Sequence, residues 1–242
     1  MLREVPPPRP EPDELLVRVW ATGLNRADLL QRRGRYPAPA GAPADVPGLE
    51  FAGEVTEAGA EVRDWKPGDQ VMAIVAGGAY AEYARIPAEH ALPIPEGWTF
   101  DQAAAVPEAF VTAFDAMMLQ GDLRAGDRVL VHAVGSSVGV AALQLAKVTS
   151  ATVAGTSRTE AKLERAGALG LDHRVLVRDR FEPEAGLTDW ADLIVELVGG
   201  HYLVGDLRAV APRGRIMLIG LAAGRETTLD LGALLTKRVS LV

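Results

Sequence analysis

The segment 129–139, VLVHAVGSSVG, is the feature that most constrains how this chain can fold. Residues 129–132 lean apolar and predict a short buried strand, and residues 133–139 predict a turn made of small residues. From Val138 onward, apolar residues recur at helical spacing. A strand, a small turn and a helix form the first half of a dinucleotide-binding βαβ unit. In such a unit a pyrophosphate lies against the turn and meets the N–H groups of the helix start.

The turn departs from the strict glycine fingerprint of such units. Counting back from Gly139, the Gly-x-Gly-x-x-Gly pattern requires glycines at two positions that are occupied by Val134 and Ser136. A looser pattern of Ala133, Ser136 and Gly139 remains. An ordinary buried strand, turn and helix would give the same pattern, so the interpretation depends on the elements that follow.

After residue 127 the sequence alternates between strand and helix patterns. The predicted strands cover residues 128–132, 152–156, 174–177, 192–198 and 215–220, with a last one from about Val239. The predicted helices cover residues 159–169 and 202–210, in addition to the one that follows the glycine turn. This order predicts an α/β fold with a doubly wound parallel (Rossmann) sheet, which binds ligands at the carboxyl ends of its strands.

The first half of the chain predicts a mainly-β domain, in the form of a small barrel. Residues 1–14 are a proline-rich lead-in, and a strand follows over residues 15–21. Asn25 is a good N-cap for a helix that Gly34 ends. Further strands are expected within the following segments: 47–60, 66–75 and 77–87. Residues 66–69 have the sequence of a tight turn between two strands.

A helical region joins the two halves. Residues 99–102 form a capping box, Pro107 interrupts the helix that this box opens, and Gly121 ends the continuation. We therefore expect two domains, a β-rich domain at residues 1–107 and a dinucleotide-binding domain at residues 108–242.

Composition excludes several classes of function. The 242 residues carry a net charge of −7 and no cysteine. The absence of cysteine excludes disulfides, thiolate metal sites and cysteine catalysis. The negative charge argues against a general nucleic-acid surface or an anionic-membrane surface. No apolar run reaches the length of a membrane span and no signal-peptide core is present. We expect a cytoplasmic protein.

The end of the second predicted parallel strand indicates which nicotinamide cofactor fits. An NAD-binding unit places an acidic residue here to hold the ribose 2′-hydroxyl. The chain instead has Ser157, Arg158 and Lys162, and Arg178 follows the third strand. Cations and a hydroxyl favour the 2′-phosphate of NADPH. The alternative is that Arg158 and Lys162 are a solvated pair on a surface helix.

Five motifs also identify the chain as similar to a known family. They are NRADLLQRRGRYP, PGLEFAGEVTEAGAEV, KPGDQVMA, PEGWTFDQAAAVPEAFVTAF and AGDRVLVHAVGSSVG. The chain resembles the quinone oxidoreductases, the zinc-lacking branch of the medium-chain dehydrogenases/reductases. The resemblance implies a GroES-like barrel domain before the Rossmann domain. It also implies longer relatives, with a first strand before this sequence and a segment after Val242 that completes the catalytic domain and the last Rossmann strand.

The resemblance assigns roles to particular residues. It implies catalytic-site roles for Asn25, Asp28 and Tyr36, and it implies contacts with the cofactor for Thr112, Ser136, Ser137, Val138, Gly139, Ser157, Arg158, Lys162, Arg178, Gly220 and Leu221. It implies no metal, because Leu49 stands where zinc-dependent relatives carry a histidine ligand.

Each of these residues also has a simpler interpretation. Asn25 alone could serve as a helix cap, Tyr36 as a loop aromatic on prolines, and Thr112 as an interior helix hydroxyl. Glu50 and Asp69 are better explained as structural than as catalytic residues. The four histidines have no triad or metal spacing, and His132 is expected merely to end a core strand.

The resemblance implies hydride transfer from NADPH to a quinone or similar conjugated carbonyl, without zinc. Two alternatives remain at this point. One is an NADPH-dependent enoyl reductase, and the other is a non-catalytic nucleotide-binding or crystallin-like protein. The partners expected are a small-molecule quinone or enone and a second copy of the chain, paired through the last strand at residues 239–242. We expect no nucleic acid and no membrane as partners.

Overall fold

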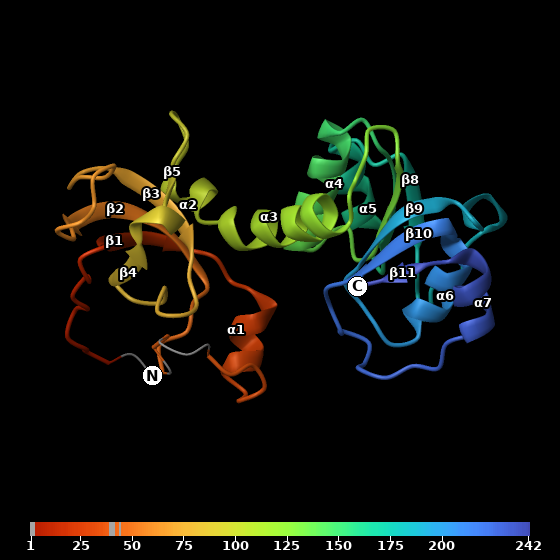
Figure 1. The fold of residues 1–242 in the computed structure, drawn as a ribbon, viewed down its shortest axis with the longest axis horizontal. Coiled ribbons are helices and arrows are strands. Elements are labelled where there is room, and N and C mark those ends of the chain that lie inside the picture. Colours follow the sequence, from red (N-terminus) through yellow and green to blue (C-terminus); the bar gives the residue numbers. More distant parts are fainter. Residues whose placement is uncertain (1–2, 39–41, 44) are drawn as a thin grey trace. The chain divides into compact units, whose positions relative to one another are not determined.

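The computed structural model describes residues 3–38, 42–43 and 45–242 (Figure 1). The chain divides into two compact units, Met1–Glu108 and Ala109–Val242, and each is described by itself. The first two residues of the proline-rich lead-in lie outside the described residues. In the described part of the chain, no helix has the length and apolar character needed to cross a membrane.

The first unit is built on a five-stranded antiparallel sheet with the strand order β4-β1-β2-β3-β5. The strands are β1 (Glu14–Thr22), β2 (Glu50–Ala58), β3 (Gln70–Ile74), β4 (Tyr83–Pro87) and β5 (Leu92–Pro93). Alternate residues of β1, such as Leu15 and Val17, are buried against Phe51, as period-two patterning requires. The turn at residues 66–69 is confirmed, since Asp69 N–H donates to the carbonyl of Lys66 at 3.1 Å.

Short helices complete the first unit. Helix α1 (Arg26–Gln31) begins after Asn25 as predicted, but it ends three residues before Gly34. A 3₁₀ turn, η1 (Ala88–His90), precedes β5. The predicted capping box is confirmed at α2 (Phe100–Ala103), where Gln102 N–H donates to the Thr99 hydroxyl. Helix α3 (Pro107–Phe114) belongs mostly to the second unit, which begins at Ala109. It starts at the proline that interrupts the pattern, because proline suits the first position of a helix.

The continuation of α3 differs from the expectation of a regular helix. Residues Asp115–Gln120 form a π-helix, η2, which Gly121 ends. A side chain at Gly121 would lie 2.6 Å from the carbonyl oxygen of Ala116. The close approach of the backbone at this point explains why a glycine ends the helical region.

The second unit contains a six-stranded parallel sheet with the order β11-β10-β9-β6-β7-β8. Its strands are β6 (Arg128–Val131), β7 (Thr152–Ser157), β8 (His173–Leu176), β9 (Ala191–Glu196), β10 (Val210–Leu218) and β11 (Ser240–Leu241). The chain order reverses between β6 and β9, and ligands of doubly wound sheets bind at such a point. The predicted parallel α/β sheet is confirmed.

Helices cover both faces of this sheet (Figure 1). Helices α4 (Ser137–Val148) and α5 (Glu160–Ala168) bury Ala142 and Leu163 on one face. Helices α6 (Tyr202–Ala209) and α7 (Leu231–Lys237) pack on the other, together with a 3₁₀ turn, η3 (Ala185–Leu187). The sequence analysis missed α7, and it started β10 five residues too late, at Arg215.

Candidate functional site

The turn that follows β6 has the geometry of an anion site. Ala133 has a positive φ of 47°, and the Ser136 hydroxyl caps α4 by accepting the N–H of Gly139 at 3.1 Å. In the described part of the chain, the N–H groups of Ser137 and Val138 have no acceptor. Free N–H groups at the start of a twelve-residue helix favour a bound phosphate.

Gly139 is required by close packing in this turn. A Cβ atom there would lie 2.5 Å from the carbonyl oxygen of Ala133 and 2.8 Å from the Cα of Val134. The start of α4 therefore lies directly against the end of β6. This contact explains why Gly139 remains in a turn whose other fingerprint glycines are replaced.

The predicted cations lie after the neighbouring strands β7 and β8. Ser157 ends β7, and its buried hydroxyl accepts the N–H of Thr159 at 3.2 Å. Arg158, Lys162 and Arg178 are exposed, and none of them forms a hydrogen bond or ion pair within the described residues. The stem of Lys162 covers Gly135, where an added Cβ would lie 2.8 Å from the Lys162 Cβ. The structure thus brings Lys162 onto the turn after β6, whereas no hydrogen bond or ion pair among the described residues joins Arg178 to it.

A second turn lies beside this one, after β9. Gly199 and Gly200 both have positive φ, and a Cβ on Gly199 would lie 2.9 Å from the carbonyl oxygen of Gly220. Gly220 N–H donates to the carbonyl of Glu196 at 3.1 Å, and Leu221 is 46% exposed. The predicted backbone pair Gly220 and Leu221 therefore follows β10 at the same edge of the sheet as the turn after β6.

The first unit contains a buried polar network around Asn25 and Asp28. The Asp28 carboxylate accepts hydrogen bonds from the Asn25 backbone N–H (2.7 Å), the Gly48 N–H (3.2 Å) and the Tyr80 hydroxyl (2.8 Å). The Asn25 amide donates to Glu50 at 2.7 Å. Asp28 thus fixes the backbone around Asn25, and Asn25 does more than cap a helix.

Glu50 and Glu108 add acidic groups to this network. The Glu50 carboxylate also accepts the backbone N–H of Glu108 at 2.9 Å. Burial raises the pKa of Glu50, and burial together with the charges of Glu50 and Asp28 raises the pKa of Glu108 to about 7. Sequence reasoning treated Glu50 as structural and missed Tyr80 and Glu108, because the contacts join residues up to 58 positions apart.

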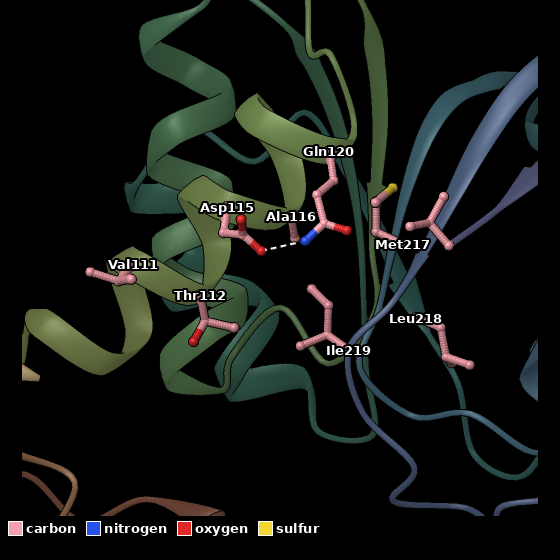
Figure 2. A pocket seen from close by; sticks show the side chains of 9 residues that line it. Val111, Thr112, Asp115, Ala116, Gln120, Met217, Leu218 and Ile219 are labelled. Carbon is pink, nitrogen blue, oxygen red and sulfur yellow. Dashed lines mark hydrogen bonds between the residues drawn. The ribbon is translucent and has the colours of Figure 1, made fainter. Parts of the chain in front are cut away.

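Tyr36 and Thr112 lie in different surroundings. Tyr36 is 41% exposed and its hydroxyl has no hydrogen bond within the described residues. Thr112 lines a cavity of about 380 Å³ in the second unit, together with residues of η2 and the end of β10 (Figure 2). In Figure 2, Asp115 and Gln120 of η2 are joined by a hydrogen bond beside the cavity. The structure therefore places Thr112 on a hollow, partly polar surface.

Sequence reasoning also missed a buried group formed by His132, Glu196 and Asp206. Their nitrogen and oxygen atoms lie within 4.8 Å of one another, and all three side chains are fully buried. These donor types also occur in metal sites, although their spacing along the chain gives no motif. His132 was expected only to end a core strand; its ring is instead 2.7 Å from the Asp206 carboxylate.

Replacing Tyr80 with phenylalanine tests the network in the first unit. Tyr80→Phe removes one donor to a buried carboxylate, so we expect the free energy of unfolding to fall by about 2 kcal/mol. Tyr83→Phe is the matched control, because the Tyr83 hydroxyl has no hydrogen bond in the described residues. Urea unfolding measures both variants. Equal stabilities would show that the Tyr80 hydroxyl does not hold Asp28.

Comparison with known proteins identifies the family. Residues 11–96 match the family described as "Alcohol dehydrogenase GroES-like domain", and residues 137–242 match "Zinc-binding dehydrogenase". A crystal structure of an NAD-dependent alcohol dehydrogenase is 32% identical, with a TM-score of 0.85, and the alignment covers 99% of this chain and 79% of that one. The chain belongs to the medium-chain dehydrogenase/reductase superfamily. The expected GroES-like domain followed by a Rossmann-like sheet is confirmed.

Other members of this oxidoreductase superfamily are similar over most of the chain. Escherichia coli quinone oxidoreductase complexed with NADPH is 28% identical, with a TM-score of 0.84, over 99% of this chain and 75% of that one. The CurK enoyl reductase is 26% identical, with a TM-score of 0.80, and the alignment covers 100% of this chain and 74% of that one.

Two curated relatives are longer than this chain. The pikromycin polyketide synthase component PikAII of Streptomyces venezuelae is 36% identical over 222 residues, which is 89% of this chain and 6% of that protein. The synaptic vesicle membrane protein VAT-1 homolog of Mus musculus is 34% identical over 232 residues, which is 91% of this chain and 55% of that protein. The chain thus spans about half of one relative and a small part of the other.

Proposed function

We propose that this chain is an NADPH-dependent reductase of a quinone or a similar conjugated carbonyl, and that it works without zinc. The observation that carries the proposal is the pair of exposed cations, Arg158 and Lys162, after β7, in a position where NAD-binding units have an acidic residue. Lys162 covers Gly135 of the phosphate-binding turn, which supports a role for this pair toward the 2′-phosphate.

The relatives give this proposal independent support. The Escherichia coli quinone oxidoreductase is complexed with NADPH in its crystal structure, and that protein is similar over almost the whole chain. The helix at residues 25–29 also resembles that of the tumour-suppressor-inducible quinone oxidoreductase. The alcohol dehydrogenase among the relatives is described as NAD-dependent, so the fold alone does not decide the coenzyme, and we assign the preference of this chain to Arg158 and Lys162.

The residues of this chain do not fit the zinc that one family description names. The chain has no cysteine, and Leu49, a buried apolar residue, precedes Glu50 where the zinc-dependent branch has a histidine. Both oxygens of the Glu50 carboxylate already accept hydrogen bonds, from the Asn25 amide and the Glu108 N–H. The proposed reaction therefore includes no Lewis-acid step through a metal.

A bound reduced nicotinamide would supply the hydride. The N–H groups of Ser137 and Val138 would bind the pyrophosphate, with Gly139 keeping the helix start close to β6. Arg158 and Lys162 would bind the 2′-phosphate, Ser157 and Arg178 would support them, and Thr112, Gly220 and Leu221 would border the nicotinamide. Because the Ser136 hydroxyl caps the helix, it would act by holding these N–H groups in place.

The substrate-side roles follow from the network in the first unit. Asn25 uses one amide hydrogen on Glu50, and the second would donate to the oxygen of the acceptor. Asp28 would act as a positioning residue, since its carboxylate holds the Asn25 backbone and Tyr80. Tyr36, which is 41% exposed, would contact the substrate. A reduced quinone takes its protons from solvent, so no dedicated acid is needed.

An enoyl reductase is the second candidate. The similarity to a polyketide synthase component and to the CurK enoyl reductase favours it. A non-catalytic nucleotide-binding protein is the third. We also propose a cytoplasmic homodimer joined through β11, an edge strand that pairs only with β10 in the described residues.

Steady-state kinetics separate these functions. We expect the protein to oxidise NADPH with a simple ortho- or para-quinone, and to be slower with crotonyl thioester and with NADH. Preferred reduction of the thioester would instead support an enoyl reductase. Binding of NADPH without turnover of either substrate would support the non-catalytic alternative.

A further inference from the structure

The buried group of His132, Glu196 and Asp206 lies at the carboxyl edge of the parallel sheet. His132 directly follows β6, Glu196 ends β9, and Asp206 is in α6. The His132 Nε2 atom is 2.7 Å from Asp206 Oδ1 and 3.8 Å from Glu196 Oε2. The proposed function gives this group, hereafter the buried triad, no task.

The hydrogen bonds around His132 indicate which of its two ring nitrogens carries the proton. The Thr156 hydroxyl accepts the N–H of Ala133 at 3.2 Å and lies 3.0 Å from His132 Nδ1. Within the described residues the hydroxyl hydrogen has no other acceptor, so it is donated to Nδ1. The ring proton is then on Nε2, where it is donated to Asp206. Since Nε2 carries this proton, it has no lone pair to offer a metal ion.

The two carboxyl groups each have an oxygen atom within 4.8 Å of the other group, and we expect them to hold one further proton between them. Glu196 Oε1 accepts the N–H groups of Val198 and Gly199, whereas Glu196 Oε2 and Asp206 Oδ2 are buried and without a partner in the described residues. Two ionised carboxylates in an apolar core are strongly unfavourable. Burial raises the pKa of Glu196 and of Asp206 to about 7, and burial lowers the pKa of His132.

Aromatic residues enclose the buried triad. The rings of Phe181 and Tyr202 meet His132 edge-on, with centroids 4.7 and 5.1 Å away. Tyr202 is a further titratable group packed on the buried triad, and burial raises its pKa. The charges of Arg158 and Asp179 also influence the pKa of Tyr202. Tyr202 is therefore within electrostatic reach both of the buried triad and of one cation of the proposed dinucleotide site.

The buried triad holds the turns of that site. The Glu196 side chain fixes the turn after β9 through two N–H groups, and its carbonyl accepts the N–H of Gly220. His132 and Thr156 fix Ala133 at the start of the turn after β6. One buried proton-bearing group therefore supports the turns after β6, β9 and β10.

We propose that His132, Asp206 and Glu196 form a proton-sharing unit that positions these turns for an anionic dinucleotide and weakens its binding when the shared proton is lost. This inference rests on the proposed function, since it needs a dinucleotide at this edge of the sheet. Loss of the proton adds a negative charge beneath a site for phosphates, which disfavours their binding. Dinucleotide affinity should therefore fall as the pH rises through about 7.

Two isosteric variants test this inference. In Asp206→Asn the new amide can donate to Glu196 Oε2 and still accept from His132, and in Glu196→Gln the amide can donate to Asp206 Oδ2. We expect calorimetry with NADP⁺ to give a dissociation constant for the unaltered chain that rises at least about fivefold from pH 6 to 8.5. Both variants should lack this rise, because neither keeps the shared proton. Loss of a proton from the ligand's own 2′-phosphate at about pH 6 makes the ligand more anionic and lowers the dissociation constant, and it does so equally in all three proteins.

The outcomes separate this inference from the proposed function. If NADP⁺ binds and the pH dependence is the same in all three proteins, the proton-sharing unit is refuted while the proposed function stands. If NADP⁺ does not bind at any pH, the proposed function fails, and with it the link to a dinucleotide. Stoichiometric metal in the purified protein, lost in Asp206→Asn, would also overturn proton sharing.

Thermal unfolding tests the shared proton without any ligand. Carboxyl groups whose pKa is raised in the folded state bind more protons than in the unfolded chain between about pH 4 and 7. The unaltered chain should therefore lose stability as the pH rises across that window, relative to Asp206→Asn. Parallel stability curves for the two proteins would overturn the shared proton.

Discussion

Replacing both Arg158 and Lys162 with alanine should remove the preference for NADPH. Each cation would form charge-assisted hydrogen bonds with the 2′-phosphate, worth about 1.5–3 kcal/mol per contact. Loss of two such contacts should raise the KM for NADPH about 10²- to 10⁴-fold. The KM for NADH should change little, because NADH has no phosphate at this position. Steady-state kinetics with each coenzyme measures the two KM values, and their ratio gives the coenzyme preference.

Arg165→Ala is the matched control for this double variant. Arg165 is an exposed cation on the same helix, α5, one turn further along, and it forms no ion pair in the described residues. Its removal changes the net charge without changing the predicted phosphate site, so coenzyme preference should stay as it is. A double variant that still prefers NADPH as strongly as the unaltered chain would refute the assignment of both cations.

The parallel sheet was predictable because its signals are local. Strand β6, the small turn and the start of α4 occupy consecutive residues, and the alternation of strands and helices that follows them supports the interpretation as a parallel sheet. The cations were found in the same way, since Arg158 and Lys162 lie close to the end of one strand. Helix α7 was missed although Asp230 caps it through the N–H groups of Gly232 and Ala233, because seven residues give a weak periodic signal.

The polar networks could not be predicted from local patterns. Asp28 and Tyr80 are 52 residues apart, and His132 and Asp206 are 74 residues apart. Each of these side chains alone has an ordinary structural explanation, and only the folded sheet brings the partners together. Burial then raises the pKa of Tyr80 and Asp206 and lowers the pKa of His132, which no motif records. The sequence therefore predicts the turn after β6 better than the buried acidic groups of either unit.

Replacing the closely packed Gly139 with alanine should have the second large effect, on both stability and catalysis. In a helix, alanine is more favourable than glycine by about 1 kcal/mol, so propensity alone predicts that Gly139→Ala stabilises the protein. The added Cβ, however, would lie 2.5 Å from the Ala133 oxygen and 2.8 Å from the Val134 Cα. Both are backbone atoms that no rotamer change can move, so α4 must shift away from β6. Overpacking of this kind costs about 1–3 kcal/mol.

The same shift should affect catalysis more than stability. The N–H groups of Ser137 and Val138 move with the helix start, and a misplacement of about 1 Å can lower a rate by about 10²-fold. We therefore expect kcat/KM with NADPH to fall by about that factor in Gly139→Ala. Gly186→Ala is the control, since no heavy atom lies within 4 Å of its added Cβ. Because both variants add the same methyl group, a difference between them measures the contact of α4 with β6. Full activity in Gly139→Ala would mean that the phosphate does not bind at this turn.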